Sequence, residues 1–139
     1  MAFYGVIKKS EIAKKEESME KEGRYWLDLI PWQENENFIC KIVKVENSKI
    51  QPALHRRDHD IYHVLEGTAK FTFKGELVNP HKIENECDPE TVRGNGIKGG
   101  ETFEIAEGDL VSIPKNTPHT VDATNSKIVF LTIKVNAGE

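Results

Sequence analysis

Residues 38–135 hold a succession of short segments rich in β-branched and aromatic residues, and this succession constrains the fold more than any other feature. Such segments are typical of β-strands, which we predict over 38–45, 61–65, 70–74, 102–105, 110–113 and 128–135. Turn-forming Gly or Pro lies between them, at Glu66-Gly67, Lys74-Gly75, Glu107-Gly108-Asp109 and Pro114-Lys115-Asn116. Because no helices alternate with these segments, the predicted fold class is all-β, an antiparallel sandwich or barrel.

The N-terminal third of the chain is different, because charged residues dominate it. Residues 8–24 carry eleven charges in seventeen positions, and a helix is predicted over 11–22, with Ser10 as its N-cap and Gly23 as its C-terminal stop. We expect residues 1–36 to form this helix and an edge segment that pack on a barrel formed by residues 37–139. Residues 79–100 show no apolar periodicity and are predicted to form a long loop or hairpin excursion.

Length, charge and hydropathy exclude several classes of protein. A chain of 139 residues fits one domain, and a net charge of −4 argues against a nucleic-acid partner. No apolar run approaches the ~20 residues of a membrane span, so we expect no membrane partner and a cytoplasmic location. Cys40 and Cys87 lie far apart and outside any CxxC pair, so they are predicted to be a buried strand thiol and a loop thiol.

Histidine is the scarce residue type that can carry chemistry here, with five in the chain. His55 precedes a short polar stretch that can turn the chain, Asp60 opens the next predicted strand, and His119 lies beyond a further turn. Side chains at strand ends of this kind can face one interior. Two imidazoles and a carboxylate form a nitrogen and oxygen ligand set for a divalent ion, so we predict a metal site of His55, Asp60 and His119.

Two stretches around these residues resemble known motifs. The run His55-x4-Asp60-Ile61-Tyr62-x-Val64-Leu65-Glu66-Gly67 is similar to the first motif of the cupin superfamily, and Gly108-x5-Pro114-x-Asn116-x2-His119 is similar to the second. The run GDLVSIPKNTPH is the most diagnostic part. The resemblance implies a cupin double-stranded β-helix, which is a jelly-roll barrel with one open mouth, here with a short N-terminal helix.

The cupin resemblance also assigns ligand positions, some of which this chain does not fill. The second histidine of the first motif falls on His55, the acidic ligand on Asp60 and the histidine of the second motif on His119. The first histidine of the first motif falls on Ala53, the acidic position holds Asp where Glu is usual, and the terminal Asn of the second motif falls on Ala123. The remaining set resembles the facial triad that holds non-haem iron. A degenerate, metal-free cupin is also expected to lack these family ligands.

The other histidines have separate predictions. His59 is an alternative metal ligand, which an irregular turn would bring in place of Asp60 or of the ligand missing at Ala53; otherwise it is a surface turn residue. His63 has the parity of His59 and is expected to be partly buried and hydrogen-bonded outside the cavity. His81 is predicted to be a solvated loop residue.

The pocket lining follows from alternation along the strand that starts at Asp60. This alternation points Tyr62 and Val64 inward, so the Tyr62 hydroxyl is a candidate for substrate binding, with packing at the rim as the other interpretation. Four cationic residues are candidates to decorate the mouth and to favour an anionic ligand: Arg56, Arg57, Lys115 and Lys127.

Two hypotheses of function from different classes follow from these features. The first is a single-domain metal-binding cupin that holds one divalent ion of Fe, Mn, Ni or Zn and acts on or binds a small polar molecule. If it is an enzyme, we expect a metal-dependent dioxygenase or isomerase. The alternative is a non-catalytic small-molecule-binding module with a degenerate or empty metal site, and a third interpretation is a structural role with a vestigial pocket. The resemblance also implies a homodimer, for which residues 1–45 are the candidate contact.

Overall fold

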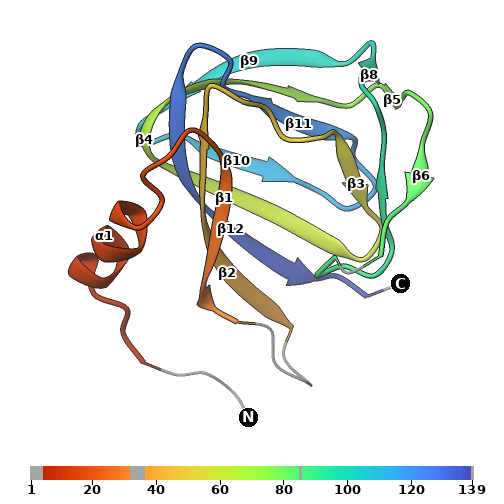
Figure 1. The fold of residues 1–139 in the computed structure, drawn as a ribbon. Coiled ribbons are helices and arrows are strands. Elements are labelled where there is room, and N and C mark those ends of the chain that lie inside the picture. Colours follow the sequence, from red (N-terminus) through yellow and green to blue (C-terminus); the bar gives the residue numbers. More distant parts are fainter. Residues whose placement is uncertain (1–4, 32–36, 85, 139) are drawn as a thin grey trace.

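The computed structural model describes residues 5–31, 37–84 and 86–138, which form one short helix and a set of antiparallel strands (Figure 1). The predicted all-β class is therefore confirmed. The helix is α1 (Lys9–Glu17). The strands are β1 (Gly23–Ile30), β2 (Phe38–Glu46), β3 (Ala53–His55), β4 (Asp58–Phe73), β5 (Glu76–Leu77), β6 (His81–Lys82), β7 (Thr91–Arg93), β8 (Ile97–Lys98), β9 (Glu101–Ala106), β10 (Leu110–Ile113), β11 (His119–Asp122) and β12 (Lys127–Asn136).

Most strands belong to one sheet that curls into a barrel with two facing walls (Figure 1). One wall has the order β1-β2-β12-β4, with β10 paired to the other side of the first half of β4. The second half of β4 pairs with β9 and β11 in the opposite wall, which continues through β3, β7 and β6. Strand β4 thus connects the two walls and fixes how they face each other.

The bend of β4 occurs at Glu66-Gly67, where the sequence predicts a turn. That prediction is wrong, because the strand continues through both residues from Asp58 to Phe73. Gly67 has a φ of 82°, and a Cβ atom at this position would lie 1.9 Å from the backbone oxygen of Lys127. The pairing register with β12 also shifts between Val129 and Phe130. Glycine therefore permits a bulged bend within one strand, where a chain reversal was expected.

The main core fills the space between the two walls. Alternate residues of β2, β4 and β12 point inward, so that side chains such as Val45, Val64, Ile128 and Phe130 are almost fully buried. This alternation follows from the period of two residues along a β-strand. The core fills one end of the barrel, and polar side chains occupy the other end.

A second apolar cluster lies on the outer side of the first wall, where α1 packs. Met19 is 4% exposed and clusters with Ile42 of β2 and Val129 of β12. The helix ends at Glu17 so that Met19 can reach this surface, and the Lys44 ammonium donates to the backbone oxygens of Met19 and Lys21. These contacts explain why the helix ends before the predicted residue 22; it also begins at Lys9, before the predicted residue 11.

The predicted caps of this helix are wrong as well. Ser10 lies inside α1, whose N-cap is Lys8, and Gly23 opens β1. Within the described residues, no helix has the length and apolar character needed to cross a membrane.

Residues 79–100 were predicted to form a long loop or hairpin excursion, and they contain short strands, of which β6 and β7 pair antiparallel. Strand β7 pairs with β3 on one side and β6 on the other, and β8 pairs with β5. The segment is anchored by Asp88, which is fully buried and accepts hydrogen bonds from the backbone N–H groups of Arg57, Asp58 and Glu90. The anchor holds the segment against the open end of the barrel.

Candidate metal centre

The structure brings His55, Asp60 and His119 together at the open end of the barrel. His55 ends β3, Asp60 lies near the start of β4, and His119 is the first residue of β11. Each offers a ligand atom within 4.8 Å of the others, and all three side chains are buried. They are the three residues that the sequence predicts as metal ligands. The described residues contain no other such group.

Both imidazoles present Nε2 to the Asp60 carboxylate. Asp60 Oδ2 lies 3.4 Å from His55 Nε2 and 3.7 Å from His119 Nε2. The ring centroids of the two histidines are 5.3 Å apart. The two nitrogens and the carboxylate therefore converge from three strands on one small volume.

Hydrogen bonds on the far side of each ring fix its tautomer. The Thr91 hydroxyl donates to the backbone oxygen of Asp88 at 2.8 Å, so it accepts from His55 Nδ1 at 2.7 Å. His119 Nδ1 donates to the backbone oxygen of Thr117 at 2.8 Å. Because each neutral ring carries its hydrogen on Nδ1, each Nε2 has a lone pair aimed at the site.

Electrostatics keep these two rings neutral. Burial lowers the pKa of His55 far below its ordinary value, and the positive charges of Lys134 and Arg93 lower it further. Burial also lowers the pKa of His119, although Asp60 and the Thr117 carbonyl oppose the shift. A neutral imidazole is the form that binds a metal, so both histidines are ready ligands near neutral pH.

Lys134 enters the same volume, and sequence reasoning did not single it out. Its Nζ lies 2.9 and 3.2 Å from the two carboxylate oxygens of Asp60, and 3.2 Å from His55 Nε2. Strand β12 places Lys134 directly opposite Asp60. The signal was available, because alternation from Ile128 and Phe130 points residue 134 inward as well.

The donor set fits a divalent ion, provided that the Lys134 ammonium moves. Two neutral imidazoles and one carboxylate are ligands that iron, manganese, nickel and zinc accept. The ammonium already neutralises Asp60, and a divalent ion beside it would repel it. The long Lys134 side chain is 13% exposed and borders the cavity, so it can withdraw toward solvent.

The structure does not bring the other histidines to the site. His59 lies on the opposite face of β4, and its Nδ1 accepts a hydrogen bond from the backbone N–H of Lys115 at 2.9 Å. His63 is exposed, so its predicted partial burial is wrong: the outer face of β4 is open to solvent there. His81 is exposed, as expected, although it lies in the short strand β6.

The two alanines at family ligand positions are buried. Ala53 pairs in register with His119 and is 2% exposed, while Ala123 is fully buried in the main core. A methyl group therefore stands at each position, and neither contributes a ligand atom.

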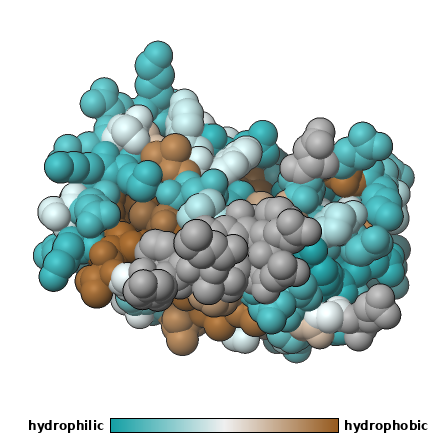
Figure 2. Space-filling view, turned by 90° about the horizontal axis from the view of Figure 1, so that it is seen from below, coloured by the Kyte–Doolittle hydropathy of each residue, from teal (hydrophilic) through white to brown (hydrophobic). Residues whose placement is uncertain are grey.

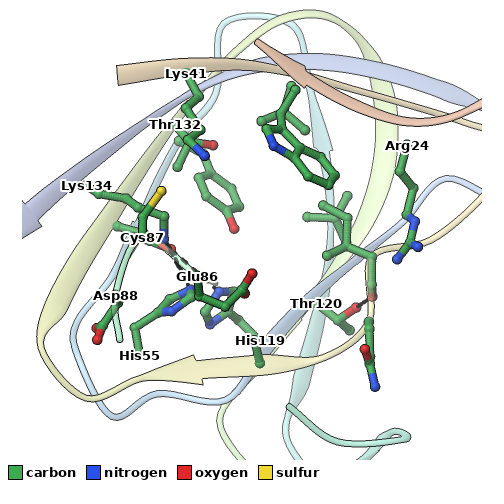
Figure 3. A pocket seen from close by; sticks show the side chains of 18 of the residues that line it. Arg24, Lys41, His55, Glu86, Cys87, Asp88, His119, Thr120, Thr132 and Lys134 are labelled. Atoms are coloured by element: carbon green, nitrogen blue, oxygen red, sulfur yellow. Dashed lines mark hydrogen bonds and ion pairs between the residues drawn. The ribbon is translucent and has the colours of Figure 1, made fainter. Parts of the chain in front are cut away.

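A cavity of about 320 Å³ opens beside the triad (Figure 3). Its volume lies at the lower end of the ~300–1,000 Å³ typical of small-molecule sites. Tyr62 lines it, as predicted from alternation, and is 6% exposed. Cys87, one of two free cysteines, also lines it, together with Glu86 and Asp88 of the anchored segment.

The cations at this cavity are not those that the sequence suggested. Arg56, Arg57, Lys115 and Lys127 do not line it. Arg57 pairs with Asp58, and Lys127 pairs with Glu66 on the surface. The lining cations are Arg24 of β1, Lys41 of β2, Arg93 of β7 and Lys134 of β12.

Comparisons with solved structures show the same barrel fold. No family model and no curated protein matched the chain. Among solved structures, the cupin protein BF4112 from Bacteroides fragilis aligns with a TM-score of 0.54 and 20% identity, covering 86% of this chain and 80% of that one. KdgF from Halomonas sp. aligns with a TM-score of 0.57 and 14% identity, covering 84% and 83%. The DMSP lyase DddQ from Ruegeria pomeroyi aligns with a TM-score of 0.58 and 16% identity, covering 84% and 49%.

Fold and site together define a small β-barrel with a buried His-Asp-His group in an open pocket. The structural likenesses show that this barrel has the cupin fold, as the sequence motifs predicted.

Proposed function

We propose that this cupin-type barrel binds one divalent metal ion through His55 Nε2, His119 Nε2 and an Asp60 oxygen, and uses it on a small polar molecule in the pocket. The observation that carries the proposal is the pair of fixed tautomers, because both Nε2 lone pairs face the Asp60 carboxylate.

The ion would supply Lewis-acid chemistry, or with iron the chemistry of an oxygenase, because three protein ligands leave coordination positions open. Side chains of the pocket would orient the bound molecule. Tyr62 is buried, and its burial together with the charge of Asp60 raises its pKa well above 10, so its hydroxyl stays protonated and can donate a hydrogen bond to a ligand. One structural neighbour is a lyase, so a barrel of this shape can hold an active site, although the fold alone does not assign one.

Elemental analysis of the purified protein tests the proposal. We expect about one iron, manganese, nickel or zinc ion per chain in the wild type, and none in His119→Ala. His63→Ala is the matched control, because His63 is exposed on the outer face of β4 and should leave the metal content unchanged. Protein that stays metal-free after incubation with each ion would overturn the proposal.

A second candidate function is a metal-free binding module, and Lys134 favours it. The ammonium already neutralises the buried Asp60 carboxylate, so the site is electrostatically satisfied without an ion. A wild type without metal that still binds small molecules would support this candidate.

If metal is present, oxygen consumption with small phenols, keto acids and thiols separates an oxygenase from an isomerase.

We further propose a homodimer that involves the N-terminal 45 residues. Strand β1 forms one edge of the sheet, and Val6 and Phe38 are 74% and 40% exposed. Hydrophobic side chains also gather on the side of the molecule that carries α1 (Figure 2). A dimeric mass in sedimentation equilibrium is expected, and a monomeric mass at micromolar concentration would contradict it.

A further inference from the structure

On the inner face of the first wall, residues that pair in register form rows across β4, β12 and β2, and these rows line the pocket. In the row nearest the metal centre, Asp60 of β4 stands opposite Lys134 of β12. In the next row, Thr132 of β12 lies between Tyr62 of β4 and Lys41 of β2. Figure 3 shows Lys41, Thr132 and Lys134 along this wall of the cavity. The second row, Tyr62–Thr132–Lys41, therefore lies two residues along the strands from the row that contains the candidate ligand Asp60.

Two buried hydroxyls in this row have no hydrogen-bond partner among the described residues. Tyr62 and Thr132 are each 6% exposed and line the cavity. Neither hydroxyl forms a side-chain hydrogen bond within the described part of the chain, whereas the buried Thr91 hydroxyl forms two. Burying a hydroxyl without a partner costs free energy, and a molecule bound in the cavity can supply that partner. Both hydroxyls are therefore available to form hydrogen bonds with such a molecule.

Lys41 adds a positive charge to the same row. It is half-buried and forms no ion pair with any described residue. The carboxylate nearest in register is that of Asp28 in β1, directly opposite Lys41. Asp28 is exposed, lies outside the cavity lining and forms no ion pair with Lys41.

The carboxylates that line the cavity are already engaged. Lys134 holds Asp60, and Arg93 binds Glu86 at 2.5 and 3.1 Å. Asp88 accepts three backbone N–H groups. Lys41 and Arg24 are therefore the charges at this cavity that a ligand can neutralise, and both are positive.

We infer that the Tyr62–Thr132–Lys41 row binds the carboxylate of a small organic anion. The two hydroxyls donate hydrogen bonds to the carboxylate, and the Lys41 ammonium is its counter-ion. Trp26, Val43 and Phe130 occupy the adjacent row and form an apolar wall, so the anion carries an apolar or aromatic body. The inference rests on the proposed function for its setting, because it names the class of molecule that the pocket takes.

Calorimetric titration with benzoate and with benzamide tests this inference, since the two probes share a shape and differ in charge. The protein is stripped of metal and dialysed, so that benzoate cannot bind through an ion. We expect benzoate to bind at least about tenfold more tightly than benzamide, as a charge-assisted contact requires. Equal affinities, or no binding of either probe, would overturn the inference.

Variants of the row identify the residues that cause the preference for benzoate over benzamide. Lys41→Met should abolish the preference for benzoate, Lys41→Arg should retain most of it, and Thr132→Val should weaken benzoate binding severalfold. The matched control is Lys98→Met, because Lys98 is exposed in β8 and away from the cavity. A preference that survives in Lys41→Met, or that is lost in Lys98→Met, would contradict the assignment. Circular dichroism verifies that each variant is folded.

The result separates the two proposals. If the wild type binds metal and shows no preference for benzoate, the proposed function stands and the carboxylate site falls. If benzoate is preferred by a protein that never takes up metal, the carboxylate site stands and the metal function falls.

Discussion

The Lys134 ammonium lies 2.9 Å from Asp60 Oδ1, among the same atoms that would ligate a metal ion. The pair is buried, since the Asp60 side chain is 2% exposed and that of Lys134 is 13% exposed. A buried carboxylate needs a counter-charge, and the barrel provides one within its own sequence. A divalent ion and Lys134 therefore compete for one carboxylate.

Replacing Lys134 with methionine should show how strongly the ammonium competes with a metal ion and how much it stabilises the metal-free protein. Lys134→Met removes the competing charge and keeps the apolar stem, so the affinity for Zn²⁺ should rise at least about tenfold. The metal-free variant should lose about 3 kcal/mol of unfolding free energy, because Asp60 is left buried without a partner. Calorimetry and urea denaturation measure the two effects. Lys127→Met, which breaks the exposed pair with Glu66, should change neither. An unchanged Zn²⁺ affinity in Lys134→Met would show that the ammonium does not compete.

Thr91 should act on the metal through the orientation of His55. Thr91→Val keeps the shape but removes the oxygen that accepts from His55 Nδ1, so Zn²⁺ affinity should fall about tenfold or more. Thr91→Ser keeps that oxygen and should retain affinity, although it loses a buried methyl worth about 1 kcal/mol of stability. If the serine variant loses affinity as severely as the valine variant, packing rather than the hydrogen bond positions His55.

The stability of the metal-free protein should fall as the pH drops below about 6.5. Burial lowers the pKa of both His55 and His119 in the folded state, so below the ordinary histidine pKa the unfolded chain binds protons that the folded chain does not. Each histidine contributes a slope of at most about 1.4 kcal/mol per pH unit. Urea denaturation between pH 7.5 and 5 should show this slope, reduced in His119→Gln and unchanged in His63→Gln. A flat profile would contradict the neutral, buried state of the two rings.

Gly67 should be among the least replaceable glycines of the barrel. Gly67→Ala combines a positive φ with a collision against the Lys127 backbone oxygen, so it should cost more than about 2 kcal/mol. Gly99→Ala is the matched control, because Gly99 has a similar φ of 76° with nothing within 4 Å of the added Cβ, and it should cost about 1 kcal/mol. Thermal unfolding of the two variants measures the difference. Equal losses would mean that β4 can bend without glycine.

Local patterns predicted strands β2, β9, β10 and β12 well and the connections poorly. The run of β-branched and aromatic residues from Ile128 to Val135 lies within β12, and 110–113 coincides with β10, because such side chains pack well on a pleated sheet. Glu66-Gly67 has turn chemistry yet lies within β4, since the close approach of Lys127 is a contact far away in sequence. The end of α1 likewise depends on Met19 reaching Ile42.

The site was predictable where its residues stood in a motif. His55, Asp60 and His119 are brought together as the motifs imply. Lys134 and Thr91 could not be assigned from motifs, because they reach the site through strand register and through a segment anchored by Asp88. Charged residues on inward faces of predicted strands are the signal that would have identified Lys134.

An anomalous-difference map from crystals grown with Zn²⁺ tests the metal centre most directly. We predict one strong peak about 2.0–2.2 Å from His55 Nε2, His119 Nε2 and an oxygen of Asp60, with Lys134 Nζ withdrawn from its 2.9 Å contact with that carboxylate. A peak at His59 or His63, or no peak within this group at saturating Zn²⁺, would contradict the account.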